Sequence, residues 1–168
     1  MGWQYVIMTR VHPLGKVFGS LADAIAKPGC IRILVDHEGG DLEEGFRIYE
    51  TLKALGERVE GVVIGNAVSS AAIALMGCSK RLMLRGSSLR FHFPARYNSI
   101  EIFLNEDLMQ KNRESAMAAL RRVEESIIFA TGGKMSQDQV RALLKEDRKV
   151  FLDEALELGL VHGVADTL

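Results

Sequence analysis

Hydrophobic and polar positions follow two periods along this chain, one typical of strands and the other of helices. The short β-rich run from Ile31 to Val35 predicts a strand, and Gly39-Gly40 then predicts a turn. Asp41 and Glu44 resemble a capping box at a helix start. The helix that follows places its apolar residues on one face: Leu42, Phe46, Tyr49, Leu52 and Leu55.

The next part of the chain repeats this order. Val62 to Ile64 predicts a second strand. The Gly65-Asn66 turn leads into a nearly all-apolar helix from about Ser69 to Met76, which we expect to be buried on every side. Two further strands are predicted at Arg81 to Leu84 and Leu89 to Phe93. In the last of these, Arg90 and His92 share one face, and the other face holds Leu89, Phe91 and Phe93.

Strands and helices that alternate with short connections predict right-handed βαβ units in a mostly parallel sheet covered by helices, an α/β fold. No repeat, low-complexity segment or linker divides the 168 residues, so we expect one domain, residues 1–168. Open α/β sheets bind ligands outside the carboxyl ends of their strands. Gly39-Gly40 and residues 66–70 both lie at such ends, so we expect reactive groups there.

A long helix is predicted from about Asn105 to Ala130, with Thr131-Gly132-Gly133 after it. At ~1.5 Å per residue it would be ~40 Å long, about the full width of a domain this size, so we expect it to project. Because an apolar stripe on a projecting helix needs a partner, the pattern predicts oligomerisation. The apolar positions of the stripe include Leu108, Leu120, Val123 and Ile127.

The C-terminal part continues with short elements. Ser136 with Gln139 predicts a capped helix to about Glu146. The apolar run Lys149-Val150-Phe151-Leu152 follows. Asp153 then begins a short helix that Gly159 ends.

The charge balance narrows the classes of partner. Lys and Arg number 21 and Asp and Glu 22, which gives a formal charge of −1, and no long block of one sign occurs. This argues against a nucleic-acid or anionic-membrane binder. The most apolar stretch, Ala67 to Met76, is half the roughly 20 residues needed to cross a bilayer, and the N-terminus lacks the features of a signal peptide. We therefore expect a soluble protein.

Metal, cofactor and disulfide motifs are absent from the sequence. Cys30 and Cys78 are scattered, which predicts neither a disulfide framework nor a zinc site and fits a reducing cytoplasm. His37-Glu38 leads into glycines and not into His-Glu-x-x-His. Neither Gly-x-x-x-x-Gly-Lys-Ser/Thr nor Gly-x-Gly-x-x-Gly occurs, so we expect no nucleotide hydrolysis. The hydrolase elbow Gly-x-Ser-x-Gly is missing too, because Ala67 and Ala71 flank the serine at position 69.

Ser69 and Ser70 stand where a strand gives way to a helix, and one of these hydroxyls could be a nucleophile. A nucleophilic serine needs a base, a group that orients the base, and donors for the oxyanion. His92 could be the base, and Asp147 could orient it. The N–H groups of Gly40 and Ser70 could form an oxyanion hole, since a helix start favours negative charge.

Each of these residues also has a purely structural interpretation. A serine at a strand-to-helix junction is most often a cap. His92 on a half-buried strand is more often a satisfied core or surface histidine. Asp147 could end a helix or pair with Arg148 at the surface, and Gly39-Gly40 could be only a turn. Periodicity and composition leave both interpretations open.

Five segments within residues 31 to 165 occur in a recognisable order and spacing. They are Gly39-Gly40 with Gly45-x-x-Ile48-Tyr49-x-x-Leu52; Gly65-Asn66-Ala67-Val68-Ser69-Ser70-Ala71; Phe91-His92-Phe93-Pro94; Thr131-Gly132; and Asp147-Arg148, eight residues before Ala155 in Glu154-Ala155-Leu156-Glu157-Leu158-Gly159-Leu160-Val161. In these segments the chain resembles the Clp protease proteolytic subunit family, within the wider crotonase-like superfamily. The family's segments are Pro-Gly-Gly and its helix, Gly-Gln-Ala-Ala-Ser-Met-Gly, Ile-His-Gln-Pro, the end of a handle helix, and Asp-Arg with Glu-Ala-x-x-x-Gly-Leu-Val.

The resemblance implies a ClpP-like fold with a projecting handle helix at about 105–130. It implies that Ser69 and not Ser70 is the nucleophile, with His92 as base, Asp147 as third triad member, and oxyanion N–H groups from Gly40 and Ser70. It further implies a serine endopeptidase without a cofactor. Such an enzyme cleaves peptides or unfolded protein inside a closed chamber of stacked homo-oligomeric rings, and unfolding is left to a separate AAA+ ATPase.

The sequence departs from the family pattern in four places. His37-Glu38 replaces Ser-Pro before the two glycines, which removes a proline that stiffens the oxyanion turn and adds a carboxylate; that charge is unfavourable unless it points away. Ser70-Ala71 replaces Met-Gly, and Ala95-Arg96-Tyr97-Asn98-Ser99 replaces a Gly-rich strand that aligns substrate. About 30 residues precede Ile31, which leaves little for the axial loops that meet an ATPase.

Two other functions stay open on the same fold. An acyl-CoA enzyme would use the two N–H donors to stabilise a thioester enolate and would bind coenzyme A. A non-catalytic assembly subunit is favoured by the departures at Glu38 and Ser70. The complete Ser, His and Asp set in protease order favours the peptidase.

Overall fold

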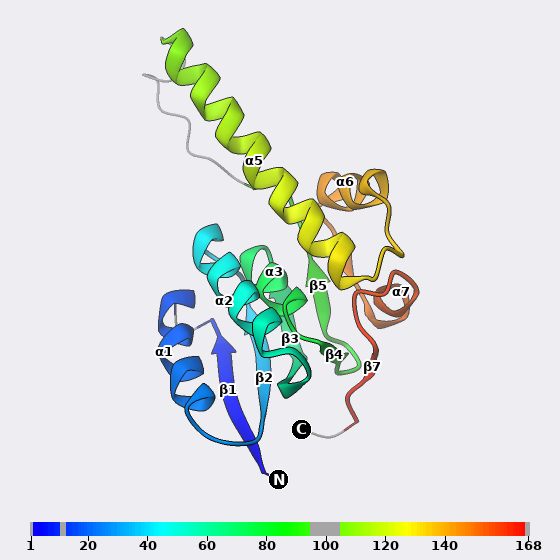
Figure 1. Ribbon diagram of the computed structural model, residues 1–168. Coiled ribbons are helices and arrows are strands. Elements are labelled where there is room, and N and C mark those ends of the chain that lie inside the picture. Colours follow the sequence, from blue (N-terminus) through cyan, green and yellow to red (C-terminus); the bar gives the residue numbers. More distant parts are fainter. Residues whose placement is uncertain (1, 11–12, 95–104, 167–168) are drawn as a thin grey trace.

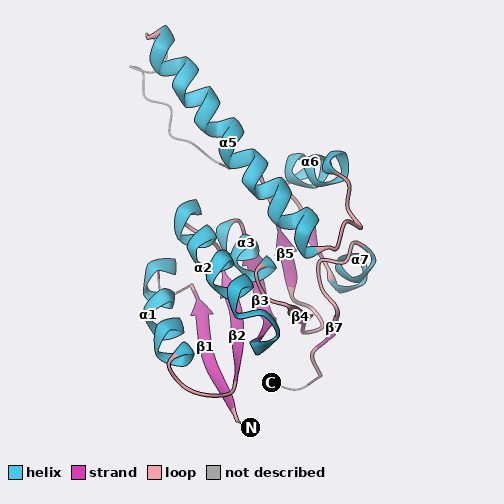
Figure 2. Cartoon of the chain, in the orientation of Figure 1, coloured by secondary structure: helices cyan, strands magenta, loops and turns pink. Residues whose placement is uncertain are grey.

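A mostly parallel sheet forms the centre of the computed structural model, which describes residues 2–10, 13–94 and 105–166 (Figures 1 and 2). The order of its main path is β1-β2-β3-β4-β7. Neighbouring strands along this path pair in parallel. The bounds are β1 Trp3–Thr9, β2 Cys30–His37, β3 Val59–Val68, β4 Lys80–Met83 and β7 Gly163–Val164. The α/β fold that the sequence predicts is confirmed.

The long strand β3 has two successive neighbours on one side. Its first half pairs with β4, and its last three residues pair in parallel with β5, Ser88–Arg90. β5 also pairs antiparallel with β6, Lys149–Val150. This arrangement carries the end of β3 beyond β4, to the place where the candidate site lies.

Three helices cover one face of the sheet, as Figure 1 shows: α1 Leu14–Ile25, α2 Leu42–Leu55 and α3 Ser70–Met76. The burial of β1 follows from this one-sided cover, because Val6 and Met8 are buried while Tyr5 and Ile7 on the other face stay about half exposed. α3 is buried along its whole length, as its apolar sequence predicts. The short helix Gly56–Arg58 follows α2.

The N-terminal part was not predicted. The sequence analysis assigns no element before Ile31, yet β1 and α1 lie there and belong to the fold. α1 is amphipathic, and its buried residues are Leu14, Val17, Leu21 and Ala24. β1 extends the sheet by pairing along its full length with β2.

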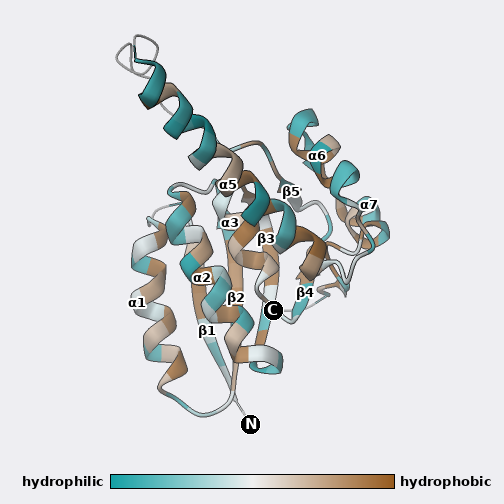
Figure 3. Ribbon diagram, turned by 45° about the horizontal axis from the view of Figure 1, so that its top comes forward, coloured by the Kyte–Doolittle hydropathy of each residue, from teal (hydrophilic) through white to brown (hydrophobic). Residues whose placement is uncertain are grey.

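The projecting helix is confirmed as α5, Glu106–Ala130, which begins at the N-cap Asn105. Figures 1 and 3 show its first turns extending away from the sheet, and in Figure 3 these turns are mostly hydrophilic. Its buried residues all lie in the second half: Val123, Glu124, Ser126 and Ile127. Leu108, which the sequence pattern places on one apolar stripe with Val123 and Ile127, is 43% exposed. The stripe is therefore buried in the same chain only over its second half.

The buried carboxylate of Glu124 attaches α5 to α6, Gln137–Glu146. It accepts hydrogen bonds from Gln137 Nε2 and Arg141 Nε, both at 2.6 Å. Although burial opposes ionisation, these hydrogen bonds hold the pKa of the Glu124 carboxyl below its ordinary value. α6 has the capping box that Ser136 and Gln139 predict. Since Asp147 is the C-cap of α6, the Glu124 contacts also position that residue.

Candidate active site

Ser69 lies at the sharp turn where β3 ends and α3 begins. Its backbone angles are φ 57° and ψ −128°, and among the described residues other than glycine only Asp147 also has a positive φ. Such conformations cost roughly 1–3 kcal/mol and cluster at functional sites. The Ser69 side chain makes no cap hydrogen bond to α3. Helix capping therefore does not explain the serine at this position.

Close packing fixes the Ser69 turn on two sides. The Ser69 N–H donates to the Arg90 carbonyl at 2.9 Å, which continues the pairing of β3 with β5. On the other side, α2 approaches α3 so closely that a Cβ on Gly45 would lie 2.7 Å from the Ser70 carbonyl oxygen. A residue with a side chain could not occupy position 45 without a shift of backbone. The start of α3 is thus held between β5 and α2.

The Gly39-Gly40 turn lies against Ser69. Gly39 has φ +94°, and a Cβ there would lie 2.8 Å from Ser69 Cβ and 3.1 Å from the Ser70 nitrogen. Ser70 is the first residue of α3, so its N–H has no acceptor within the helix. Gly40, Ser69 and Ser70 line one cavity. With His92, which lines the same cavity, the structure therefore brings together four of the five residues that the sequence proposes for the site.

The negative charge beside this turn is neutralised. Arg10, directly after β1, pairs with Glu38 at 2.9 Å from Nη2 to Oε1, and the same nitrogen is 3.6 Å from Asp36. Glu38 is not among the described residues that line the cavity. From the sequence, an oxyanion hole at this turn requires that the Glu38 carboxylate points away from it. The pairing with Arg10 meets this condition.

A cavity of about 630 Å³ opens in front of Ser69, a volume in the usual range for ligand pockets, about 300–1,000 Å³. Its wall is mostly apolar, with a few polar groups. α5 contributes to the wall from the buried part of the helix. The described lining residues are Gly40, Asp41, Leu42, Glu43, Ser69, Ser70, Ile73, Phe91, His92, Pro94, Ala119, Val123 and Leu144.

His92 shares this cavity with Ser69. Its Nδ1 lies 2.8 Å from the Phe93 carbonyl oxygen. Because a carbonyl oxygen only accepts, Nδ1 carries the proton in this contact, and in the neutral ring Nε2 then has the lone pair. An imidazole in this tautomer can accept the proton of a hydroxyl. Ser69 and His92, both within the described part of the chain, are not hydrogen-bonded to each other in this structure.

The predicted strand Leu89 to Phe93 is wrong beyond Arg90, where β5 ends. Its partner β6 has only two residues, and β3 ends at Val68, so the described part of the chain offers no strand with which residues after Arg90 could pair. Phe91 is buried but Phe93 is 42% exposed, so these two rings do not share a buried face. His92 is consequently placed by a loop and not by the pleat of a strand.

Asp147 is the C-cap of α6, with φ 47° and ψ 43° in the left-handed region. Its Oδ1 accepts a hydrogen bond from Arg90 Nε at 2.9 Å. The Arg90 guanidinium holds the pKa of the Asp147 carboxyl below its ordinary value, and His92 acts in the same direction. In this structure the carboxylate is therefore bound to Arg90, and no hydrogen bond connects it to the His92 ring.

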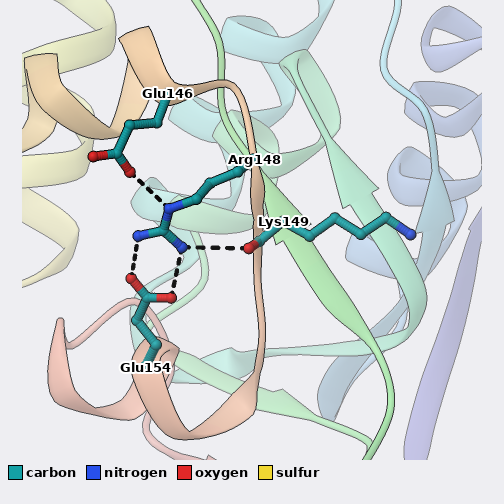
Figure 4. Close-up of polar contacts among 4 residues, drawn as sticks. All are labelled: Glu146, Arg148, Lys149 and Glu154. Carbon is teal, nitrogen blue, oxygen red and sulfur yellow. Dashed lines mark hydrogen bonds and ion pairs between the residues drawn. The ribbon is translucent and has the colours of Figure 1, made fainter.

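Arg148, the next residue, binds two other carboxylates (Figure 4). Its Nε donates to Glu146 at 2.6 Å, and its two terminal nitrogens donate to Glu154 at 2.7 and 2.5 Å. Glu146 ends α6, and Glu154 belongs to α7, Leu152–Glu157. Arg148 thus joins the two helices on either side of Asp147 and does not pair with Asp147 itself.

Arg90 and Arg10 are charged residues of the site that the sequence analysis left without a role. A signal for Arg90 exists, because the sequence places it on one strand face with His92. No such signal exists for Arg10, since it follows a strand that the hydrophobic pattern did not reveal. Arg90 binds Asp147, which is itself a proposed catalytic group, and Arg10 binds Glu38 beside the Gly39-Gly40 turn.

Within the described ranges, no group of three or more His, Cys, Asp or Glu side chains could hold a metal ion. No described helix is long and apolar enough to cross a membrane. The departure at Ala95 to Ser99 lies outside the described residues.

Comparisons with known proteins place the chain in a family. A family model described as Clp protease matches residues 20–167. The ATP-dependent Clp protease proteolytic subunit 1 of Nocardia farcinica is 29% identical over 136 residues, which cover 80% of this chain and 66% of that protein. The subunit of the same name from Corynebacterium glutamicum is 28% identical over 138 residues, 81% of this chain and 64% of that protein. The chain spans just under two thirds of the length of these relatives.

A solved structure has the same fold. It is a ClpP1 mutant from Listeria monocytogenes, with a TM-score of 0.77 and 22% identity over 97% of this chain and 91% of that one. The mostly parallel sheet and the long helix follow this architecture. Because the family model matches nearly the whole length, this chain belongs to the Clp protease family.

Proposed function

We propose that this chain is a serine endopeptidase that cleaves peptides or unfolded protein. The observation that carries the proposal is the Ser69 hydroxyl, which makes no cap hydrogen bond and stands on a strained turn at the cavity wall. His92 lines the same cavity, and Gly40 and Ser70 adjoin the serine. The chemistry of this residue set is acyl transfer with a covalent intermediate.

In the proposed reaction, the Ser69 hydroxyl attacks the carbonyl carbon of the peptide bond while His92 Nε2 takes its proton. The carbonyl oxygen becomes an oxyanion, which accepts hydrogen bonds from the N–H groups of Gly40 and Ser70. The imidazolium then gives the proton to the leaving amine, and an acyl-enzyme remains. Water hydrolyses the acyl-enzyme with the same histidine as base.

Asp147 completes the proposed triad after it leaves Arg90. The Nδ1–H of His92 now donates to the Phe93 carbonyl, and a carboxylate in its place would stabilise the imidazolium with a full negative charge. An aspartate carboxyl with its ordinary pKa is already ionised at neutral pH, so Asp147 stays charged after it leaves Arg90. The proposed reactive arrangement thus requires Asp147 to exchange Arg90 for His92, and Ser69 to form a hydrogen bond with His92.

The proposed enzyme acts as a homo-oligomer. Leu108, Met109 and Met117 on the first half of α5 are each 42–43% exposed, and exposed apolar residues on a projecting helix fit contacts with another copy. The relatives are named subunits of an ATP-dependent protease, which supports stacked rings with a AAA+ unfoldase as partner. A monomeric mass by light scattering at micromolar concentration would contradict the oligomer.

Serine-reactive fluorophosphonate tests the proposal, with Ser70→Ala as a matched control. We expect labelling of the assembled wild-type protein, none of Ser69→Ala, and undiminished labelling of Ser70→Ala. The Ser70 hydroxyl is buried without a hydrogen-bond partner among the described residues, so its removal relieves a desolvation cost of about 1–3 kcal/mol. Labelling that is absent, or that persists in Ser69→Ala, would sink the peptidase proposal.

A non-catalytic assembly subunit is the second candidate. The ion pair between Arg90 and Asp147 favours it, because this pair withholds the third triad member from His92. The two candidates differ in one observable. A protein that assembles fully and still fails to react with fluorophosphonate is the assembly subunit.

A further inference from the structure

The turn from His37 to Gly40 sets the position of the proposed oxyanion donor at Gly40. Gly39 has φ +94°, and a Cβ on it would lie 2.7 Å from the Val68 carbonyl oxygen and 2.8 Å from Ser69 Cβ. The turn is therefore in direct contact with the nucleophile segment. A small change in its shape would move the Gly40 N–H relative to the Ser69 hydroxyl.

His37 is the residue that closes this turn. It ends β2, just after the irregular register between Val35 and His37, and is 4% exposed. Its Nδ1 accepts a hydrogen bond from the Gly39 N–H at 2.8 Å. Nδ1 therefore carries no proton, which requires the neutral Nε2–H tautomer. The imidazole binds the backbone of its own turn from a buried position.

Gly39 and Gly40 differ in what their backbone contacts. The Gly39 N–H is satisfied by His37, whereas Gly40 lines the cavity. Glu38, between His37 and the glycines, is drawn to Arg10 at 2.9 Å. The turn is thus anchored by one side chain on the inside and by another on the outside.

We propose that His37 is a positioning residue for the oxyanion hole. Its Nδ1 fixes the Gly39 peptide, and this fixes the direction of the Gly40 N–H toward the substrate oxygen. The bond supplies the stiffness that a proline at position 38 would give, and that Glu38 does not. The inference rests on the proposed peptidase function, because it assigns a role within the same site.

A preorganised oxyanion donor acts on the transition state more than on the bound substrate. The role therefore predicts a specific kinetic signature and not a general loss. Without the acceptor at Nδ1, kcat should fall about 10²- to 10³-fold, as it does when one oxyanion donor is lost. KM for a peptide should change about twofold or less, because ground-state contacts with the cavity wall remain.

Three substitutions at position 37 separate this role from simple packing. In His37→Asn the amide oxygen can reach the former place of Nδ1, whereas in His37→Gln the amide reaches the place of Nε2. His37→Leu has no acceptor at all. His162→Leu is the matched control, because His162 Nδ1 also accepts a backbone N–H, that of Arg81 at 3.0 Å, and His162 does not line the cavity. Thermal unfolding shows whether each variant is folded.

The measurements are kcat and KM for a fluorogenic peptide, and the inhibition constant of a peptidyl boronate, whose tetrahedral adduct places an oxygen in the hole. We expect His37→Leu and His37→Gln to lose boronate affinity by the same factor as kcat, and His37→Asn and His162→Leu to stay within about tenfold of wild type. If folded His37→Leu has the kcat of wild type, or if His37→Asn and His37→Gln lose kcat equally, the role of His37 is wrong. The proposed peptidase function would not be affected by either result. A wild type that reacts with neither fluorophosphonate nor boronate would overturn the proposed function and the role of His37 with it.

Discussion

Ser69 and Asp147 lie in two turns that differ in how they are held. Both residues have a positive φ, but Asp147, at φ 47° and ψ 43°, occupies the left-handed well that aspartate visits at modest cost. Ser69, at φ 57° and ψ −128°, lies outside that well. The Asp147 turn is a common helix ending, whereas the Ser69 turn is strained.

The surroundings of the two turns differ in the same way. Ser69 is fixed by a backbone hydrogen bond to Arg90 and by close contact with Gly39, which are contacts of the fold itself. The Asp147 side chain is 46% exposed and is held by one ion pair. Half of the proposed site is therefore built by packing, while the other half is set by surface charges that can exchange partners.

Asp147→Asn tests the adjustable turn most severely. An amide cannot stabilise the imidazolium and favours the wrong tautomer of His92, so peptide turnover should fall by about 10⁴-fold. The fold should remain intact, because the side chain is exposed. Asp153→Asn, a substitution at an exposed position of α7, is the control in the same peptide hydrolysis assay. Near-normal hydrolysis by Asp147→Asn would refute the role.

Much of the packed half of the site could be predicted from sequence, because packing leaves a periodic signal. The apolar run at the start of α3 predicts a buried helix with Ser69 at its beginning, and the glycines at positions 39 and 40 predict a turn at a strand end. Both features are confirmed. The sequence could not decide between a cap and a nucleophile at Ser69. That distinction depends on backbone angles and on a missing hydrogen bond.

The charged half left no comparable signal. Whether Asp147 binds His92, Arg148 or Arg90 depends on the directions of side chains at a loop, and each of these pairings is consistent with the same spacing. In the structure, Asp147 binds Arg90. Arg10 was missed for another reason, since β1 was not predicted and the partner of Glu38 lies directly after it.

Ser69→Gly tests the strained turn by separating stability from activity. Glycine adopts a positive φ without a steric penalty, so it should raise the free energy of unfolding above that of Ser69→Ala by about 1–3 kcal/mol, while both variants are inactive. Thermal and denaturant unfolding measure this difference. Asp147→Gly should gain less over Asp147→Ala, because the left-handed well is less strained. Equal gains at the two turns would contradict the comparison.

Arg90→Met tests the ion pair, and the expected effect is the smallest. Arg90 and Asp147 are 40% and 46% exposed, and ion pairs exposed to solvent contribute little to stability. If the pair competes with His92 for Asp147, its removal should raise kcat about two- to fivefold. Arg90→Lys keeps the charge but loses the planar guanidinium, so its kcat should lie between those of wild type and Arg90→Met.

Salt provides an independent measurement of the same competition. Mobile ions screen an exposed pair, so wild-type turnover should rise as salt increases from low to moderate concentration, and turnover of Arg90→Met should stay nearly constant. Arg148→Met is the matched control, because Arg148 binds Glu146 and Glu154 and not Asp147. If Arg90→Met lowers turnover, Arg90 supports Asp147 in its reactive position. In that case the Asp147 turn is as fixed as the Ser69 turn, and the contrast between them lies only in backbone strain.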